Sequence, residues 1–156
     1  STTSETNVQI DRRNLHRNYW QEIRDDKDLM PVSLHPVKFT EEMFFENRVK
    51  VSRELEPIVC SIHHQAINEL SPAFSATATS YDGKIVEGIA HKKYPNVFSV
   101  QFHPEIPDLY METALLRFAP EDTPATVHSI LGKESQEFHI KYWEFISGVI
   151  GEQASK

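Results

Sequence analysis

The chain has 156 residues, of which 39% are hydrophobic and 25% are charged, and its formal net charge is −7. This composition supports the packed core of one domain and excludes an intrinsically disordered chain. The acidic balance argues against a nucleic-acid-binding surface, and no apolar run approaches the roughly 20 residues that cross a bilayer, so we expect neither nucleic acid nor membrane as a partner.

Cysteine and glycine are scarce. The single cysteine, Cys60, excludes an internal disulfide and a four-cysteine zinc site. The first of the five glycines is Gly83, so no Gly-rich phosphate loop and no glycine-flanked nucleophile elbow precede it. The chain begins at Ser1 without a signal-peptide pattern. We expect an upstream segment in the natural protein and a cytoplasmic location.

The N-terminal part predicts short elements. Residues 1–9 are polar and predict a loop, whereas the apolar side chains within 11–28 recur at the spacing of a short helix. Two prolines bracket an extended piece over 32–39. Thr40, followed by acidic residues, predicts the N-cap of a short helix over 40–47.

The central part predicts β-strands over residues 58–62, 74–80, 84–91 and 97–102. Asp82-Gly83, between the second and third of these, is a strong signal for a two-residue hairpin turn. This part of the chain is therefore predicted to form a sheet.

The C-terminal part begins with a proline-containing stretch, 106–133, which predicts an irregular excursion with one helix over 109–118. Residues 136–150 predict a helix with an apolar stripe facing the core, formed by Phe138, Tyr142, Phe145, Ile146 and Val149. We therefore expect one α/β unit over 1–156, in which a mixed sheet with a β-hairpin is closed by the last helix.

The clearest candidate for chemistry is His103-Pro104-Glu105, directly after a predicted strand. In extended backbone, residues i and i+2 point the same way, so His103 and Glu105 are expected to face one site. A histidine oriented by a carboxylate is the base half of a nucleophilic triad. From the spacing alone, a strand-end histidine with an incidental acidic neighbour remains an alternative.

Three sequence blocks together carry a family resemblance. They are the segment Ile58 to Ile67, which contains Ser61, His63, His64 and Gln65, the segment Asp82 to Glu87, and the segment Ser99 to Glu105. In this order they resemble the class I glutamine amidotransferases, most closely the γ-glutamyl hydrolase and γ-glutamyl-γ-aminobutyrate hydrolase (peptidase C26) branch. The resemblance covers roughly residues 30–105 and implies the C-terminal part of a flavodoxin-like amidotransferase domain.

The resemblance also implies a mechanism. Such enzymes attack a γ-glutamyl amide with a cysteine, and water then hydrolyses the thioester. His103 matches the catalytic base and Glu105 the residue that orients it. Ser61, His63, His64 and Gln65 match a loop beside the substrate, and no cofactor is implied.

The family's nucleophile lies in a glycine-flanked elbow upstream of these blocks, which this sequence lacks. We therefore expect the cysteine on a missing N-terminal segment or second chain, and we expect this chain alone to be inactive. The expected substrate is a small γ-glutamyl or glutamine-like compound. A non-catalytic remnant that binds a ligand or a protein is the alternative, and a homodimer contact stays open.

Two further interpretations concern Cys60 and metals. Cys60 lies in an apolar run, where cysteine usually acts as a small buried hydrophobe, although a self-contained enzyme that uses it remains an alternative. His63, His64 and His103 match no zinc signature, so we expect no metal.

Overall fold

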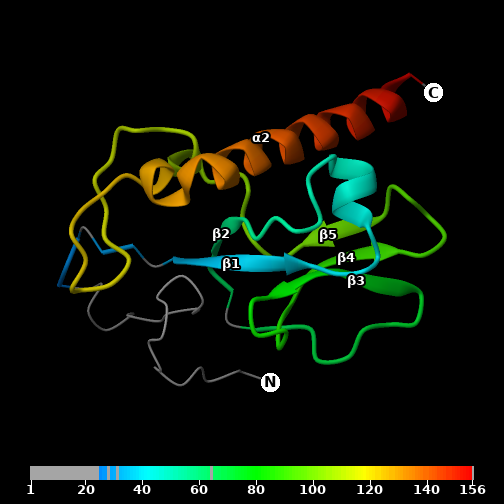
Figure 1. Ribbon diagram of the computed structural model, residues 1–156, viewed down its shortest axis with the longest axis horizontal. Helices are drawn as coiled ribbons and strands as arrows, with labels where there is room; N and C mark the ends of the chain where they lie inside the picture. The colour runs from blue at the N-terminus through cyan, green and yellow to red at the C-terminus, as the bar shows by residue number, and fades with distance from the viewer. Residues whose placement is uncertain (1–24, 28, 31, 64, 156) are drawn as a thin grey trace.

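The computed structural model describes residues 25–27, 29–30, 32–63 and 65–155. Five strands form one sheet in the order β2-β1-β3-β4-β5. A long helix, α2 (Val127–Ala154), lies along one face of this sheet (Figure 1). The strands are β1 (Ser33–Phe39), β2 (Ile58–Ser61), β3 (Phe74–Ser80), β4 (Val86–His91) and β5 (Phe98–Val100), and the short helices are η2 (Phe45–Val49) and η3 (Pro107–Leu109).

The predicted α/β fold class, with a hairpin and a closing helix, is confirmed. The prediction of a mixed sheet needs correction, because each pair of neighbouring strands in this sheet is antiparallel. Short connections such as the one between β3 and β4 can join only antiparallel neighbours, since a parallel pair needs a crossover of a dozen or more residues. Among the described residues, parallel pairing occurs at the isolated bridge between Leu29 and Arg117.

The predicted hairpin turn joins β3 to β4. Gly83 has a φ of 76°, a left-handed conformation that glycine adopts at no steric cost. Ser80 closes the turn through its backbone N–H, which donates to the carbonyl of Ile85 at 2.9 Å. Its hydroxyl lies 2.7 Å from Oδ1 of Asp82. A hairpin thus forms where the sequence predicts it, but its turn is longer than the predicted two residues, because β3 ends at Ser80 and β4 begins at Val86.

The main core lies between α2 and the sheet. Phe138 and Tyr142, one turn apart on α2, are both buried, as the predicted stripe requires. They contact Phe102, whose ring centroid lies 6.2 Å from that of Phe138 and 6.1 Å from that of Tyr142. The same cluster contains Val37, Phe45, Val49, Val51, Val59 and Ala78. This packing anchors the segment that leads to His103.

The predicted helix over 40–47 is wrong in position. Thr40 is not a helix cap, because its hydroxyl donates to the carbonyl of Ala76 at 2.6 Å and ties the chain to β3. The helical turn begins later, as η2, and its N-cap is Phe44. Because the Thr40 hydroxyl is used in this contact with β3, it does not cap the helix that the local pattern predicts.

The predicted helix over 109–118 is also wrong. Helical structure is limited there to η3, and Leu116 instead exchanges two backbone hydrogen bonds with Ala125. These bonds use the groups that a helix would need. The excursion ends at Thr126, whose hydroxyl accepts from the N–H of Ser129 and caps α2. This helix thus begins before the predicted residue 136, with a non-helical break at Gly132.

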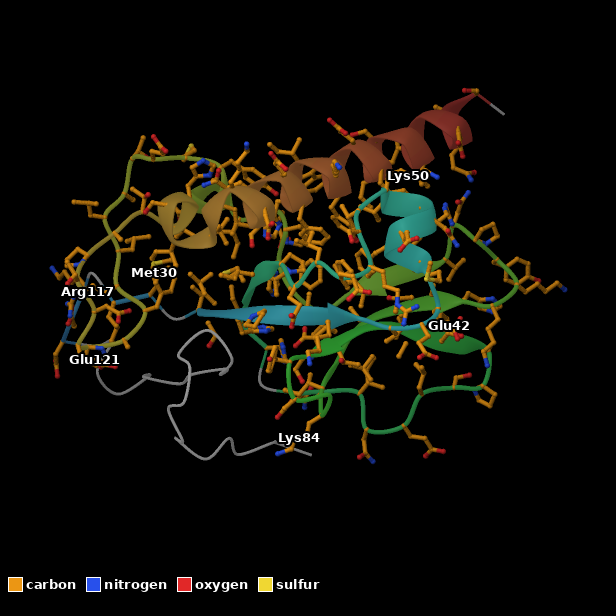
Figure 2. All side chains as sticks on the ribbon, viewed as in Figure 1. Met30, Glu42, Lys50, Lys84, Arg117 and Glu121 are labelled. Atoms are coloured by element: carbon orange, nitrogen blue, oxygen red, sulfur yellow. The ribbon has the colours of Figure 1, made fainter. Side chains whose placement is uncertain are left out.

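The excursion folds back against the residues that precede β1. The labelled side chains of Met30, Arg117 and Glu121 gather at one end of the molecule (Figure 2). The N–H of Met30 donates to the carbonyl of Arg117 at 2.8 Å, and the Arg117 guanidinium pairs with the carboxylate of Asp26. The middle of the excursion is therefore tied to the residues that precede β1.

The predictions for residues 1–9 and for most of 11–28 lie outside the described residues. Within the described part of the chain, α2 and the shorter helices lack the long apolar run that would cross a membrane.

Candidate functional site

His103 and Glu105 form the hydrogen-bonded pair that their spacing predicts. Nδ1 of His103 lies 2.8 Å from Oε1 of Glu105. A carboxylate can only accept, so Nδ1 carries the proton and donates it. This arrangement leaves Nε2 of His103 as the ring atom that can accept a proton from a reacting group. The side chains are 37% and 59% exposed, so a substrate can reach them.

The neighbouring backbone places this pair at the end of β5. Phe102 is 3% exposed and anchors the segment in the core. The N–H of His103 donates to the carbonyl of Cys60 at 2.8 Å, and the N–H of Gln101 donates to the carbonyl of Glu87 at 2.9 Å. Residues 101–105 therefore lie between β2 and β4, although they form bends and turns rather than a strand.

The hydrogen bond also changes the acidity of Glu105. Partial burial by itself raises the pKa of the Glu105 carboxyl, but the hydrogen bond from His103 and the charge of the imidazole lower it. The net result is a pKa below the ordinary value for glutamate. Glu105 is thus ionised at neutral pH and can hold the His103 ring in one orientation.

The loop after β2 lies against Gln101. The side-chain amide of Gln101 donates to the carbonyl of Gln65 at 2.6 Å, and its Nε2 also lies 2.8 Å from Nδ1 of His63. Nδ1 of His63 also lies 3.0 Å from the carbonyl oxygen of Gln65, so this nitrogen faces both a donor and an acceptor. Nε2 of His63 lies 3.8 Å from Oε1 of Glu87. Gln101 thereby connects the loop to the segment that carries His103.

A buried polar cluster lies beneath this loop. Glu87 and His35 are 0% and 1% exposed, and Oε1 of Glu87 lies 3.9 Å from Nε2 of His35. The same Nε2 lies 2.8 Å from the hydroxyl of Ser61, which is 2% exposed. The Ser61 hydroxyl therefore faces the protein interior in this structure, whereas His63 is partly exposed and Gln65 is exposed.

A pocket of about 200 Å³ opens beside the cluster. It lies over β4 and β5 and is lined by Ile67, Val86, Glu87, Gly88, Ile89, Ser99, Val100 and Gln101. Gln101 thus reaches a surface that a small molecule can contact, whereas the side chain of Glu87 is 0% exposed.

Cys60 has none of the properties of a nucleophile. Its side chain is 1% exposed and belongs to an apolar cluster with Leu34, Leu109 and Leu131. Burial, with a smaller effect from the negative charges of Glu105 and Asp108, raises the pKa of the Cys60 thiol to about 12. A reactive cysteine needs the opposite surroundings, accessible and electropositive.

Of the predicted site residues, the structure joins His103 to Glu105, and it joins His63 and Gln65 through Gln101. His64 lies outside the described residues.

The prediction missed the roles of His35 and Glu87. A charged residue between apolar neighbours in β4 was the available signal for Glu87. Their partners lie on other strands, so spacing along the chain does not reveal them. Within residues 25–155, apart from the gaps in the description, no group of three His, Cys, Asp or Glu side chains is placed to hold a metal ion.

Comparison with known proteins gives three matches. The sequence model of the peptidase C26 family matches residues 5–105. Protein NtpR of Enterococcus hirae is 52% identical over 50 residues, which are 31% of this chain and 20% of NtpR. A Thermoplasma acidophilum protein assigned as a GMP synthase subunit superposes with a TM-score of 0.44 at 16% identity, over 78% of this chain and 46% of that one. This chain thus covers less than half the length of either protein.

Proposed function

The chain belongs to the peptidase C26 family, and we propose that it contributes the His103–Glu105 pair to a cysteine-dependent hydrolase of γ-glutamyl amides. The observation that carries this proposal is the 2.8 Å hydrogen bond from Nδ1 of His103 to Glu105. It leaves Nε2 of an accessible imidazole as a general base, held in one tautomer by an ionised carboxylate.

The chemistry follows from this geometry. Nε2 of His103 takes the proton of a cysteine thiol, and the thiolate attacks the amide carbonyl of the γ-glutamyl group. The imidazolium returns the proton to the leaving amine, which departs as the thioester forms. His103 then deprotonates a water molecule, which releases glutamate and restores the thiol. Glu105 stabilises the imidazolium in both steps.

The nucleophilic cysteine is proposed to belong to a preceding segment or a second chain. Burial and a raised pKa make Cys60 unsuitable, and it is the single cysteine in these residues. The loop after β2, which contains His63, His64 and Gln65, is proposed to contact the substrate, whereas Ser61 is buried at the end of β2. Support for this comes from Gln101, which connects the loop to the segment carrying His103.

Native mass spectrometry of the protein isolated from its natural source tests the assembly. We expect a species heavier than 18.0 kDa that releases a cysteine-bearing chain on denaturation, or one longer chain that contains both parts. A lone 18.0 kDa species or a simple multiple of it would instead favour a non-catalytic binding protein.

Hydrolysis of γ-glutamyl-p-nitroanilide by the assembled enzyme tests the chemistry. We expect His103→Ala to lower kcat by about 10²- to 10⁴-fold, the usual contribution of a general base. His91→Ala, at the far end of β4, is the matched control and should keep the parent rate. Unchanged hydrolysis in His103→Ala would contradict the assignment.

A further inference from the structure

The carbonyl of Pro104, between the two members of the predicted catalytic pair, is held by two side chains. The hydroxyl of Tyr110 donates to this oxygen at 2.5 Å, and Nε1 of Trp143 donates to it at 3.0 Å. Nε1 of Trp143 also lies 2.8 Å from the Tyr110 hydroxyl. The single N–H of Trp143 is shared between these two acceptors, and the three groups form a closed triangle that includes the Pro104 oxygen.

The two donors come from parts of the fold that are distant in sequence. Tyr110 is the C-cap of η3, in the excursion, and Trp143 lies on α2. The Tyr110 ring stands edge-on to the ring of His139, with centroids 6.3 Å apart. His139 lies one turn before Trp143, and its Nε2 donates to the carbonyl of Ile58 at 3.0 Å. The triangle is therefore anchored to β2.

The turn that carries the pair is also held by two buried residues, Phe102 and Pro104. Strand β5 ends at Val100, and beyond it the N–H of His103 donates to the carbonyl of Cys60. His103 and Glu105 are too exposed for side-chain packing to hold them. The orientation of both side chains thus depends on the backbone between them, where Tyr110 and Trp143 hold the carbonyl of Pro104.

We propose that Tyr110 and Trp143 are positioning residues for the His103–Glu105 pair. Their catalytic importance rests on the proposed function, whereas their effect on the geometry of the pair does not. Both residues lie beyond the family match, which ends at residue 105. The proposal also gives the excursion a structural role, because this segment carries Tyr110.

Nuclear magnetic resonance of the 156-residue chain tests the geometric part. The pKa of Glu105, read from the titration of its carboxyl carbon, reports the hydrogen bond from His103. In Tyr110→Phe and in Trp143→Phe we expect this pKa to rise toward the ordinary value for glutamate, because the turn loosens. Trp143→Gln keeps an N–H donor, so the pKa of Glu105 should rise less in this variant. Tyr142→Phe removes a hydroxyl at the adjacent position of α2 and should leave the titration unchanged.

Two results would overturn the proposal. One is an unchanged Glu105 titration in a folded Tyr110→Phe, Trp143→Phe double variant. The other is loss of the folded spectrum in both single variants while Tyr142→Phe stays folded, which would assign the two residues to stability alone.

Kinetics of the assembled enzyme separate this proposal from the proposed function. We expect Tyr110→Phe and Trp143→Phe to lower kcat by about ten-fold with little change in KM, since misplacing a catalytic group by one ångström can cost about 100-fold. If the assembled enzyme hydrolyses no γ-glutamyl amide, the proposed function fails, and the Glu105 titration still decides the positioning role.

Discussion

Nε2 of His35 in β1 lies 2.8 Å from the hydroxyl of Ser61 in β2, 26 residues further along the chain. The other ring nitrogen, Nδ1, lies 3.2 Å from the carbonyl of Pro36, an acceptor, so Nδ1 carries a proton. Oε1 of Glu87 lies 3.9 Å from the same Nε2. Side chains from three strands thus meet in the interior, below the loop that we propose contacts substrate.

Glu87→Ala tests the contribution of this cluster to stability. Glu87 is fully buried beside His35 and His63, so its loss leaves polar groups of both rings without that carboxylate. We expect the free energy of unfolding to fall by about 3 kcal/mol, as for other broken buried pairs. Urea denaturation measures it. Glu137→Ala, at an exposed position of α2, is the control and should stay within about 0.5 kcal/mol. Equal effects of the two substitutions would contradict a central role for Glu87.

Gln101→Leu tests the attachment of the loop after β2. The substitution keeps the approximate volume but removes the amide that donates to Gln65 and His63. Because such a hydrogen bond contributes about 0.5–1.5 kcal/mol, we expect amide hydrogen exchange over residues 62–67 to become about two- to ten-fold faster. Gln153→Leu, near the end of α2, should not alter it. Equal exchange in parent and Gln101→Leu would show that other contacts hold the loop.

Alkaline conditions should weaken the fold through Cys60. Its pKa is about 12 in the folded chain against 9.0 for an ordinary thiol, so the stability from burying the neutral thiol is complete below pH 9 and is lost as the pH rises from 9 toward 12. The loss reaches at most about 1.4 kcal/mol per pH unit. Urea denaturation at pH 8 and pH 10 should therefore show a steeper decline for the parent than for Cys60→Ala.

Tyr142 provides the control for this pH dependence. Burial raises its pKa to about 12 from 10.0, so its contribution declines only above pH 10. Tyr142→Phe should therefore follow the parent between pH 8 and pH 10. An equally steep decline in Cys60→Ala and in the parent would mean that the Cys60 thiol is not protected in the folded chain.

Gly88→Ala tests the close approach of β3 and β4. A Cβ at Gly88 would lie 2.6 Å from Oγ1 of Thr77, which is buried and branched at Cβ and therefore cannot easily turn away. We expect a loss of about 1–3 kcal/mol in the free energy of unfolding. Gly148→Ala meets no atom within 4 Å and lies in α2, so it should instead stabilise by about 0.5–1 kcal/mol. Thermal unfolding of both variants shows the sign, and a stable Gly88→Ala would refute the clash.

Much of the fold follows from local patterns. The strands over 74–80 and 58–62 and the hairpin turn at Gly83 were predictable because strand patterning and turn chemistry act over a few neighbouring residues. The family resemblance, which rests on sequence blocks, is confirmed by the family match. The two helix predictions were wrong where a residue distant in sequence uses the hydrogen-bonding groups. The Thr40 hydroxyl bonds to the carbonyl of Ala76, and the backbone of Leu116 bonds to that of Ala125.

The pairing of His103 with Glu105 could be read from the chain itself, since two residues at a spacing of i and i+2 need only a suitable backbone to meet. The groups around them could not. Glu87 approaches His35 and His63 from another strand, and Trp143 reaches Pro104 from a helix 39 residues away. Sequence spacing carries information over a turn of helix or a pair of strand positions, whereas these contacts depend on strand order and on where α2 lies across the sheet, which only the packing of the whole chain determines.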